Sequence, residues 1–388
     1  MTTYKEAAST GFNLLAQQYV TPKIFDGNFW FGGNTLHTCL TYLIAAKETD
    51  TKLILKSAYG IYQGMSSGTD WWRDDYGWWG NAFILAINHR NELGYQGAGN
   101  DQLFNSLSGA AQYCWGKLKS NWCAESYGSC DGDPDNSAGS ADIIGGTFNT
   151  HNEPPMSGRN SVTNEGFWIL SQQLAQLFPQ NPSFSAAASA ESAWFQDWLA
   201  YPSNHRGKTG ILNADGIVLE RPTGNGTDPA WYWSGDQGLF IEGLSFTGSA
   251  NDIAVSAVNK MTDKDMVLHE NMSFNDYSNL KQYIADYATG KGIFMRSVAA
   301  LNLVLPDRPF TKFIENNATA VWCNRMPGNQ FTFNWNPQVA GNEPKILQAV
   351  GSKTQTLCNL IMQTAGLEAL NAALLSSLDE EIACTSGG

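Results

Sequence analysis

The chain has 388 residues, with 36 acidic and 23 basic side chains and a formal net charge of −13. This acidic balance argues against a nucleic-acid binder, which needs a basic face. Hydrophobic residues make up 43% of the chain and charged residues only 15%. Such a composition is typical of a protein that buries a core. No run of about 18 apolar residues occurs, so we expect no membrane span.

Apolar residues recur at helical spacing along most of the chain. The predicted helices run over residues 4–19, 34–47, 52–64, 76–90, 101–120, 163–177, 186–200, 236–247, 251–265, 274–288, 292–304, 311–324 and 351–377. Six of these segments are apolar almost all round, as expected for helices buried on every side: those near 34–47, 76–90, 163–177, 236–247, 292–304 and 353–377.

Six buried helices alternating with amphipathic ones predict an all-α fold, an (α/α)6 barrel formed by residues 1–388 as a single domain. An open helical solenoid is the alternative, although no consensus repeat of about 34 to 45 residues is present. Residues 210–220 alternate in polarity around a turn-like stretch, which predicts a small β-hairpin inserted in a loop.

The chain has seven cysteines and no C-x-x-C zinc spacing. Cys114, Cys123 and Cys130 surround a long polar loop, which favours at least one disulfide there, and the odd total leaves one thiol free or externally paired. N-glycosylation sequons begin at Asn225, Asn271 and Asn317. These features favour a secreted or cell-surface protein. Because the first residues lack an apolar signal segment, the chain is either cytosolic or begins after a removed signal.

Aromatic residues make up 12% of the chain, including 14 Trp. In a soluble acidic protein, such rings are suited to binding sugars, because the C–H face of a pyranose packs on an aromatic plane. A large aromatic core is the alternative, since a buried Trp is stable where its N–H finds a partner.

The segment WWRDDYGWW at residues 71–79 places two adjacent carboxylates, Asp74 and Asp75, between two Trp pairs at the start of a buried helix. Both carboxylates can point into one cavity there. Their mutual repulsion raises one pKa, while the helix dipole and Arg73 favour ionisation of the other. Such a split suits an acid and a nucleophile. The alternative is that one aspartate is simply the N-cap of the helix.

These residues resemble glycoside hydrolase family 76, the endo-α-1,6-mannanases, in which an Asp pair is followed by Gly-Trp-Trp, here at residues 77–79. Segments 29–43, 145–170, 232–244, 290–302 and 311–325 resemble further family stretches in the same order. The resemblance implies an (α/α)6 barrel and retaining hydrolysis. It implies that Asp74 is the nucleophile and Asp75 the general acid and base. Asp236 departs from the family pattern, which has Asn at that position.

Other polar residues also lie at predicted starts of inner helices, and we expect them on one rim of the barrel with the Asp pair. They are Asn34, Asn164, Glu165, Asp236 and Gln237. Each has an alternative role in capping its helix. The aromatic candidates for contact with a sugar are Trp30, Trp72, Tyr76, Trp78 and Trp79.

The resemblance predicts a glycan hydrolase, with a polysaccharide or oligosaccharide substrate. The alternatives are a transglycosylase on the same scaffold, a hydrolase of another α-glycan, and a non-catalytic lectin-like barrel. No nucleotide-binding fingerprint or H-x-x-x-H pair occurs, so we expect no cofactor and no metal. The acidic loop 131–142 lacks the order of a calcium loop. A monomer is the default expectation.

Overall fold

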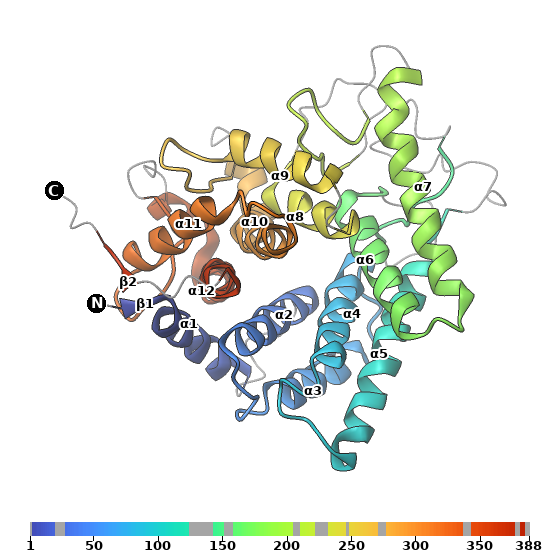
Figure 1. Cartoon of the computed structure of the whole chain (residues 1–388), viewed down its shortest axis with the longest axis horizontal. Coiled ribbons are helices and arrows are strands. Elements are labelled where there is room, and N and C mark those ends of the chain that lie inside the picture. The colour runs from blue at the N-terminus through green and yellow to red at the C-terminus, as the bar shows by residue number, and fades with distance from the viewer. Residues whose placement is uncertain are drawn as a thin grey trace. The chain divides into compact units, whose positions relative to one another are not determined.

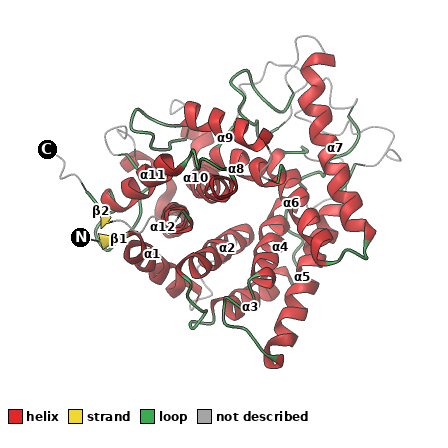
Figure 2. Ribbon diagram, in the orientation of Figure 1, coloured by secondary structure: helices red, strands yellow, loops and turns green. Residues whose placement is uncertain are grey.

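The computed structural model describes residues 2–19, 28–123, 143–150, 158–204, 210–221, 232–245, 248–270, 277–336, 343–376 and 381–384. Figure 2 shows that this described part is almost wholly helical. Its helices are α1 (Tyr4–Tyr19), α2 (Phe29–Ala46), α3 (Ile54–Ser66), α4 (Arg73–Asn88), α5 (Asp101–Lys119), α6 (Ser161–Leu177), α7 (Pro182–Asn204), α8 (Ser234–Gly243), α9 (Gly248–Met261), α10 (Tyr277–Val304), α11 (Thr311–Cys323) and α12 (Glu343–Leu375), with a short 3-10 helix at Ala98–Asn100.

The described strands, β1 (Thr2–Thr3) and β2 (Glu381–Ile382), pair antiparallel and join segments near the two ends of the sequence. Across the described residues, none of the helices has both the length and the apolar character needed to span a membrane.

The chain divides into two compact units. The first comprises Met1–Asp26, Thr38–Ile54 and Trp233–Gly388, and it holds α1, α8 to α12 and the sheet. The second comprises Gly27–His37 and Leu55–Tyr232, and it holds α3 to α7. The chain enters the second unit before α2 and leaves it within α2, then re-enters it at the start of α3 and leaves it before α8, so neither unit is one continuous stretch of sequence. A single domain over the whole chain remains a prediction.

The predicted inner helices correspond to α2, α4, α6, α8, α10 and α12. In α8, every residue except Glu242 is buried. The predicted outer helix α5 instead buries one stripe at helical spacing, formed by Phe104, Leu107, Ala110, Ala111, Cys114 and Leu118. In the second unit α4 packs on α5 and α6, and in the first unit α10 packs on α8 and α12 (Figure 1).

Several helix boundaries differ from the prediction, and two of the differences come from glycines. Helix α2 begins five residues before the predicted Asn34, and residues 277–304 form one helix rather than two. Glycine pairs normally indicate a loop. Here, however, a Cβ on Gly33 would lie 2.7 Å from the Trp79 backbone nitrogen, and one on Gly292 would lie 2.6 Å from the Ala365 Cα. These glycines therefore lie inside helices, at points where the backbones of two packed helices approach closely.

The hairpin predicted at 210–220 is present as one antiparallel bridge between Leu212 and Val218. The Asn213 side chain accepts hydrogen bonds from two backbone N–H groups of this turn. The same construction recurs at 262–268, where the bridge joins Thr262 and Leu268 and the Asp263 carboxylate accepts the corresponding bonds. This repetition was not predicted from the sequence.

The cysteines differ in part from the prediction. Cys323 and Cys384 form a disulfide, and Cys123 is also disulfide-bonded. Cys114 was expected near the disulfide of the polar loop, but it is a buried free thiol on α5, as is Cys39 on α2. Cys130 lies outside the described residues.

The sequon at Asn317 is not a glycosylation site in this fold. Its side chain is buried, donates to the carbonyls of Met266 and Phe313, and accepts from the Leu268 N–H. The other two sequons, which begin at Asn225 and Asn271, lie outside the described residues.

The close approach at Gly33 predicts a measurable difference between two glycine substitutions. We expect Gly33→Ala to lower the free energy of unfolding by about 1–3 kcal/mol, because the added methyl group overpacks the helix contact. Gly60→Ala on α3 is the matched control, since a Cβ there meets no atom within 4 Å. It should raise the free energy of unfolding by up to about 1 kcal/mol. Urea unfolding of both variants tests this, and equal stability of the two would contradict the packing described.

Candidate active site

Asp74 and Asp75 lie in the first turn of α4. The residue at the N-cap is Trp72, whose side chain makes no capping hydrogen bond. The alternative that one of the aspartates caps the helix is therefore wrong, because the helix begins before them. Asp75 is buried, and Asp74 is partly exposed.

The side chain that caps α4 is Asn149, which lies 75 residues further along the chain. Its Oδ1 accepts hydrogen bonds from the backbone N–H groups of Arg73 and Asp74, at 3.1 and 3.2 Å. Its Nδ2 donates to Oδ2 of Asp74 at 3.0 Å. The other oxygen of Asp74 accepts from the Asp75 N–H at 2.9 Å. Asn149 thus satisfies two free N–H groups of the helix start and holds the Asp74 carboxyl group.

The segment that carries Asn149 is fixed by two other asparagines. The Asn121 side chain donates to the carbonyls of Phe148 and Thr150. The Asn164 side chain accepts from the Thr147 N–H and donates to its carbonyl. The N-cap of α6 is Asn160, so the alternative that Asn164 caps this helix is wrong, and its substrate-binding role stays a prediction. Asn164 ties α6 to the segment behind the aspartate pair.

Burial raises the pKa of Asp74 to about 6 from its ordinary value of 3.8, against hydrogen bonds from Asp75, from Asn149 and from its own backbone that lower it. Arg73, expected to favour ionisation of the pair, is instead ion-paired with Asp70 at 3.1 Å. Lys117 on α5 also contacts Asp70, at 2.9 Å. Burial raises the pKa of Asp70, but these two cations outweigh it and leave the pKa below its ordinary value.

The helix packing brings several predicted residues together in the second unit. Gly77 on α4 and Gly166 on α6 approach so closely that a Cβ on Gly77 would lie 3.6 Å from the Gly166 Cα. The aspartate pair precedes Gly77, and Glu165, which is fully buried, directly precedes Gly166. The starts of α4 and α6 therefore lie side by side. Asn34 is buried on α2 next to Gly33, which contacts the α4 backbone.

The aromatic candidates divide by exposure. Trp72 is 44% exposed and Trp30 is partly exposed, with its ring 5.5 Å from the mostly buried ring of Trp78. Trp79 is fully buried and donates from Nε1 to the Phe29 carbonyl. Tyr76 is also fully buried. The expectation that Trp79 and Tyr76 offer a face to sugar is therefore corrected, because both rings are packed in the core.

Asp236 and Gln237 are fully buried in the first turn of α8, in the first unit. The Gln237 side chain donates to the Trp233 carbonyl at 3.1 Å. That these two residues share a rim with Asp74 and Asp75 remains a prediction. His151, within the resembling segment 145–170, lies outside the described residues.

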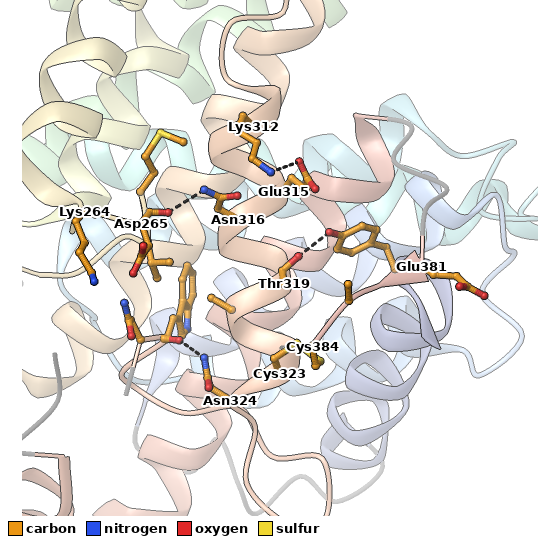
Figure 3. Close-up of a pocket in the computed structure, with 17 residues that line it drawn as sticks. Lys264, Asp265, Lys312, Glu315, Asn316, Thr319, Cys323, Asn324, Glu381 and Cys384 are labelled. Atoms are coloured by element: carbon orange, nitrogen blue, oxygen red, sulfur yellow. Dashed lines mark hydrogen bonds and ion pairs between the residues drawn. A yellow bond between two sulfur atoms is a disulfide. The ribbon is translucent and has the colours of Figure 1, made fainter. Parts of the chain in front are cut away.

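A polar cavity of about 890 Å³ lies in the first unit, beside α11 and the Cys323–Cys384 disulfide (Figure 3). One wall is the turn at 262–268, where the Asp265 carbonyl accepts from Nδ2 of Asn316 at 2.8 Å. Thr319 also lines the cavity, and its hydroxyl is hydrogen-bonded to the hydroxyl of Tyr4. The cavity contains none of the predicted site residues, so it does not mark the candidate active site.

Asn149 is the residue of the candidate site that sequence reasoning missed. It lies within the resembling segment 145–170, but nothing local identifies it as the cap of a helix 75 residues earlier. The signal was indirect: a buried helix start whose own N-cap residue is a Trp needs a polar side chain from elsewhere. Among the described residues, no group of three or more His, Cys, Asp or Glu is arranged to hold a metal.

Several solved structures share this fold. An inactive variant of a Salegentibacter α-1,6-mannanase of family GH76, solved with α-1,6-mannotriose, is 17% identical, with a TM-score of 0.61 over 94% of this chain and 99% of that one. The Lin0763 protein of Listeria innocua is 16% identical, with a TM-score of 0.64 over 98% and 99%. A family 76 glycoside hydrolase from a bovine Bacteroides thetaiotaomicron strain is 15% identical, with a TM-score of 0.57 over 90% and 69%.

No protein-family model matches the chain, and no curated protein matches it by sequence. The structural likenesses confirm the predicted fold class, an all-α (α/α)6 barrel, over at least 90% of the chain. They also confirm, at the level of fold, the resemblance to glycoside hydrolase family 76.

The raised pKa of Asp74 predicts a dependence of stability on pH. Because the folded state holds this proton up to about pH 6 and the unfolded state releases it near pH 4, the wild type loses stability as pH rises through that window. Asp74→Asn cannot titrate. Its melting temperature relative to wild type should therefore rise by about 2–4 °C between pH 4 and pH 7.

Differential scanning fluorimetry across this pH range measures the effect. Asp307→Asn, at an exposed turn, is the control and should follow the wild type at every pH. A constant difference between Asp74→Asn and wild type would show that Asp74 titrates normally.

Proposed function

We propose that this chain is a retaining glycoside hydrolase of the family 76 type, acting within α-1,6-linked mannan. The observation that carries the proposal is the adjacent pair Asp74 and Asp75 in the first turn of a buried helix, with one carboxyl group held by Asn149. The proposal covers the family, the substrate and the catalytic roles of both aspartates.

The comparison with the Salegentibacter mannanase supports the pair. The inactive variant of that enzyme carries asparagine in place of two consecutive aspartates, and it was solved with α-1,6-mannotriose. This chain has the same arrangement of two consecutive aspartates at the start of α4. An adjacent pair also suits retention, which needs the two carboxyl groups about 5–5.5 Å apart.

In the proposed mechanism the Asp74 carboxylate attacks the anomeric carbon, and the glycosidic C–O bond breaks with its electron pair moving to the leaving oxygen. Asp75 protonates that oxygen. In the second step Asp75 takes a proton from water, whose oxygen attacks the anomeric carbon and releases the ester of Asp74. With a pKa of about 6, Asp74 is ionised and nucleophilic in neutral solution.

Exposed aromatic rings close to the pair supply a surface for the sugar. Trp72 directly precedes α4 and is 44% exposed, and the rings of Trp30 and Trp78 lie 5.5 Å apart. We assign the sugar-facing role to Trp72 and Trp30. The Cys323–Cys384 disulfide fits an oxidising compartment, so we propose a secreted or cell-surface enzyme.

Replacement of either aspartate tests the pair directly. We expect unbranched α-1,6-mannan to give a ladder of short oligosaccharides with wild type, and Asp74→Asn and Asp75→Asn each to lower kcat/KM at least about a thousandfold. Asp307→Asn, which makes the same substitution at an exposed turn outside the candidate site, is the control. Residual activity above about a tenth in either pair variant, with the fold intact by circular dichroism, would remove that residue from the mechanism.

Azide separates the two roles. With an activated mannoside, Asp74→Ala should use azide as a direct nucleophile and give a mannosyl azide of inverted configuration. Asp75→Ala should instead form the glycosyl-enzyme, which azide intercepts to give the retained configuration. The opposite result would exchange the two assignments.

The anomeric course of the wild-type reaction tests the mechanism as a whole. Proton NMR during the first turnovers should detect the α-configured product before mutarotation. An initial β product would exclude a retaining enzyme. Adding a sugar acceptor to the same assay distinguishes hydrolysis from transfer, because a transglycosylase on this scaffold would elongate the acceptor rather than accumulate free reducing ends.

A further inference from the structure

We infer that Asn149 is the positioning residue of the aspartate pair: its amide orients the Asp74 carboxylate and holds it in the ionised form. The consequence for catalysis rests on the proposed function, whereas the effect on Asp74 itself does not. Oδ1 of Asn149 binds the helix backbone and Nδ2 binds the carboxylate, so one planar group fixes both relative to each other.

Two other buried helix starts are capped in the same way by a segment far along the chain. At α6, Glu220 accepts from Nδ2 of Asn160 at 3.1 Å and, through its carbonyl, from the Ser161 N–H at 2.7 Å. At α8, the Glu270 carboxylate accepts from the N–H of Ser234 at 3.0 Å and from its hydroxyl. In each unit the capping segment follows the next outer helix in the chain.

Among these three helix starts, only α4 accepts the side-chain hydrogen bond from the distant segment instead of donating it. At α6 and α8 the distant residue is a glutamate, and the helix start offers its carboxylate a side-chain donor, from Asn160 or Ser234. At α6 the backbone N–H is accepted by the Glu220 carbonyl rather than by its side chain. At α4 the helix start offers an acceptor, the carboxylate of Asp74, and the capping side chain is an amide that donates to it. An amide can accept from the backbone through its oxygen and donate to a carboxylate through its nitrogen at the same time, whereas an ionised carboxylate can only accept.

A carboxylate in place of this amide would add a third acid beside Asp74 and Asp75. Like charges at such distances raise a pKa strongly. The choice of Asn over an acid at this position therefore separates its role from simple capping, because Asp and Asn cap helices about equally well.

The amide is also rigidly placed. Asn121 and Asn164 hold the backbone on both sides of Asn149. The Asn149 N–H donates to the Gly158 carbonyl at 3.0 Å. A side chain on a segment fixed at this many points loses little freedom when it binds the carboxylate.

Other titratable or charged side chains belong to α4, to the segments that precede α4 and α6, and to the helices packed against α4: His37, Asp70, Arg73, Asp75, Tyr113, Lys117, Arg159 and Glu165. Of these, Arg73 and Lys117 are engaged by Asp70. The hydrogen bonds that the Asp74 carboxylate accepts come from the Asp75 backbone and from Asn149. Loss of the Asn149 bond should therefore shift the titration of Asp74 upward.

The test compares Asn149→Ala, Asn149→Asp and wild type in the full chain. Carbon NMR of carboxyl-labelled aspartate, with the Asp74 signal identified by its loss in Asp74→Asn, gives the pKa of Asp74 without any assay of activity. We expect the pKa to rise by about one unit in Asn149→Ala and by more in Asn149→Asp. The acid limb of the kcat/KM profile should move by the same amount, and kcat should change more than KM.

Glu220→Gln is the control. It alters a side-chain hydrogen bond at the start of α6 and leaves Asn149 and the segment around it unchanged, so it measures structural effects alone. It should not shift the pKa of Asp74. An unchanged Asp74 pKa in Asn149→Asp would overturn the inference, because a purely structural cap tolerates Asp. A shifted pKa in a chain that hydrolyses no mannan would support the inference and reject the proposed substrate.

Discussion

The starts of the inner helices place the strongest constraint on this fold. The first turn of an α-helix leaves backbone N–H groups without partners, and at α4, α6 and α8 that turn consists mostly of buried residues. The N-cap residues Trp72, Asn160 and Trp233 make no side-chain capping bond. Acceptors must therefore come from distant segments, which Asn149, Glu220 and Glu270 provide. Each capping segment follows the next outer helix in the sequence. That outer helix therefore returns the chain to the start of the inner helix that the segment caps.

The same crowding determines how the inner helices pack. Their backbones approach closely enough that only glycine fits at Gly33 and Gly292. Charged side chains that remain inside must be paired. In the first unit, Arg296 on α10 lies between Glu242 of α8 and Glu368 of α12, at 3.4 and 3.7 Å. Thr38 donates a further hydrogen bond to Glu368. Removing one partner of such a group would leave an unpaired buried charge, so these polar contacts fix the packing of the helices that carry them.

Much of the fold could be predicted from the sequence, because helical periodicity and the contrast between all-round and one-sided apolar helices are local properties. The errors have a physical cause that no local pattern contains. Gly33 and Gly292 look like helix ends unless the neighbouring backbone is known. Asp74 and Asp75 were identified as a pair because they are adjacent, but the side chain that holds Asp74 is separated from it by 75 residues. Contacts of this kind depend on tertiary packing and cannot be derived from spacing.

The capping constraint also sets α4 apart from the other two helix starts. A buried carboxylate is costly unless donors surround it. The glutamates that approach the starts of α6 and α8, Glu220 and Glu270, are acids that themselves require donors. Burial raises the pKa of Glu270 to about 7 even with Ser234 donating to it. At α4 the amide of Asn149 satisfies the backbone and still has an N–H for Asp74. Because this one side chain is an amide, α4 is the helix start of these three at which the distant segment supplies a donor to an acid rather than an acid that needs one.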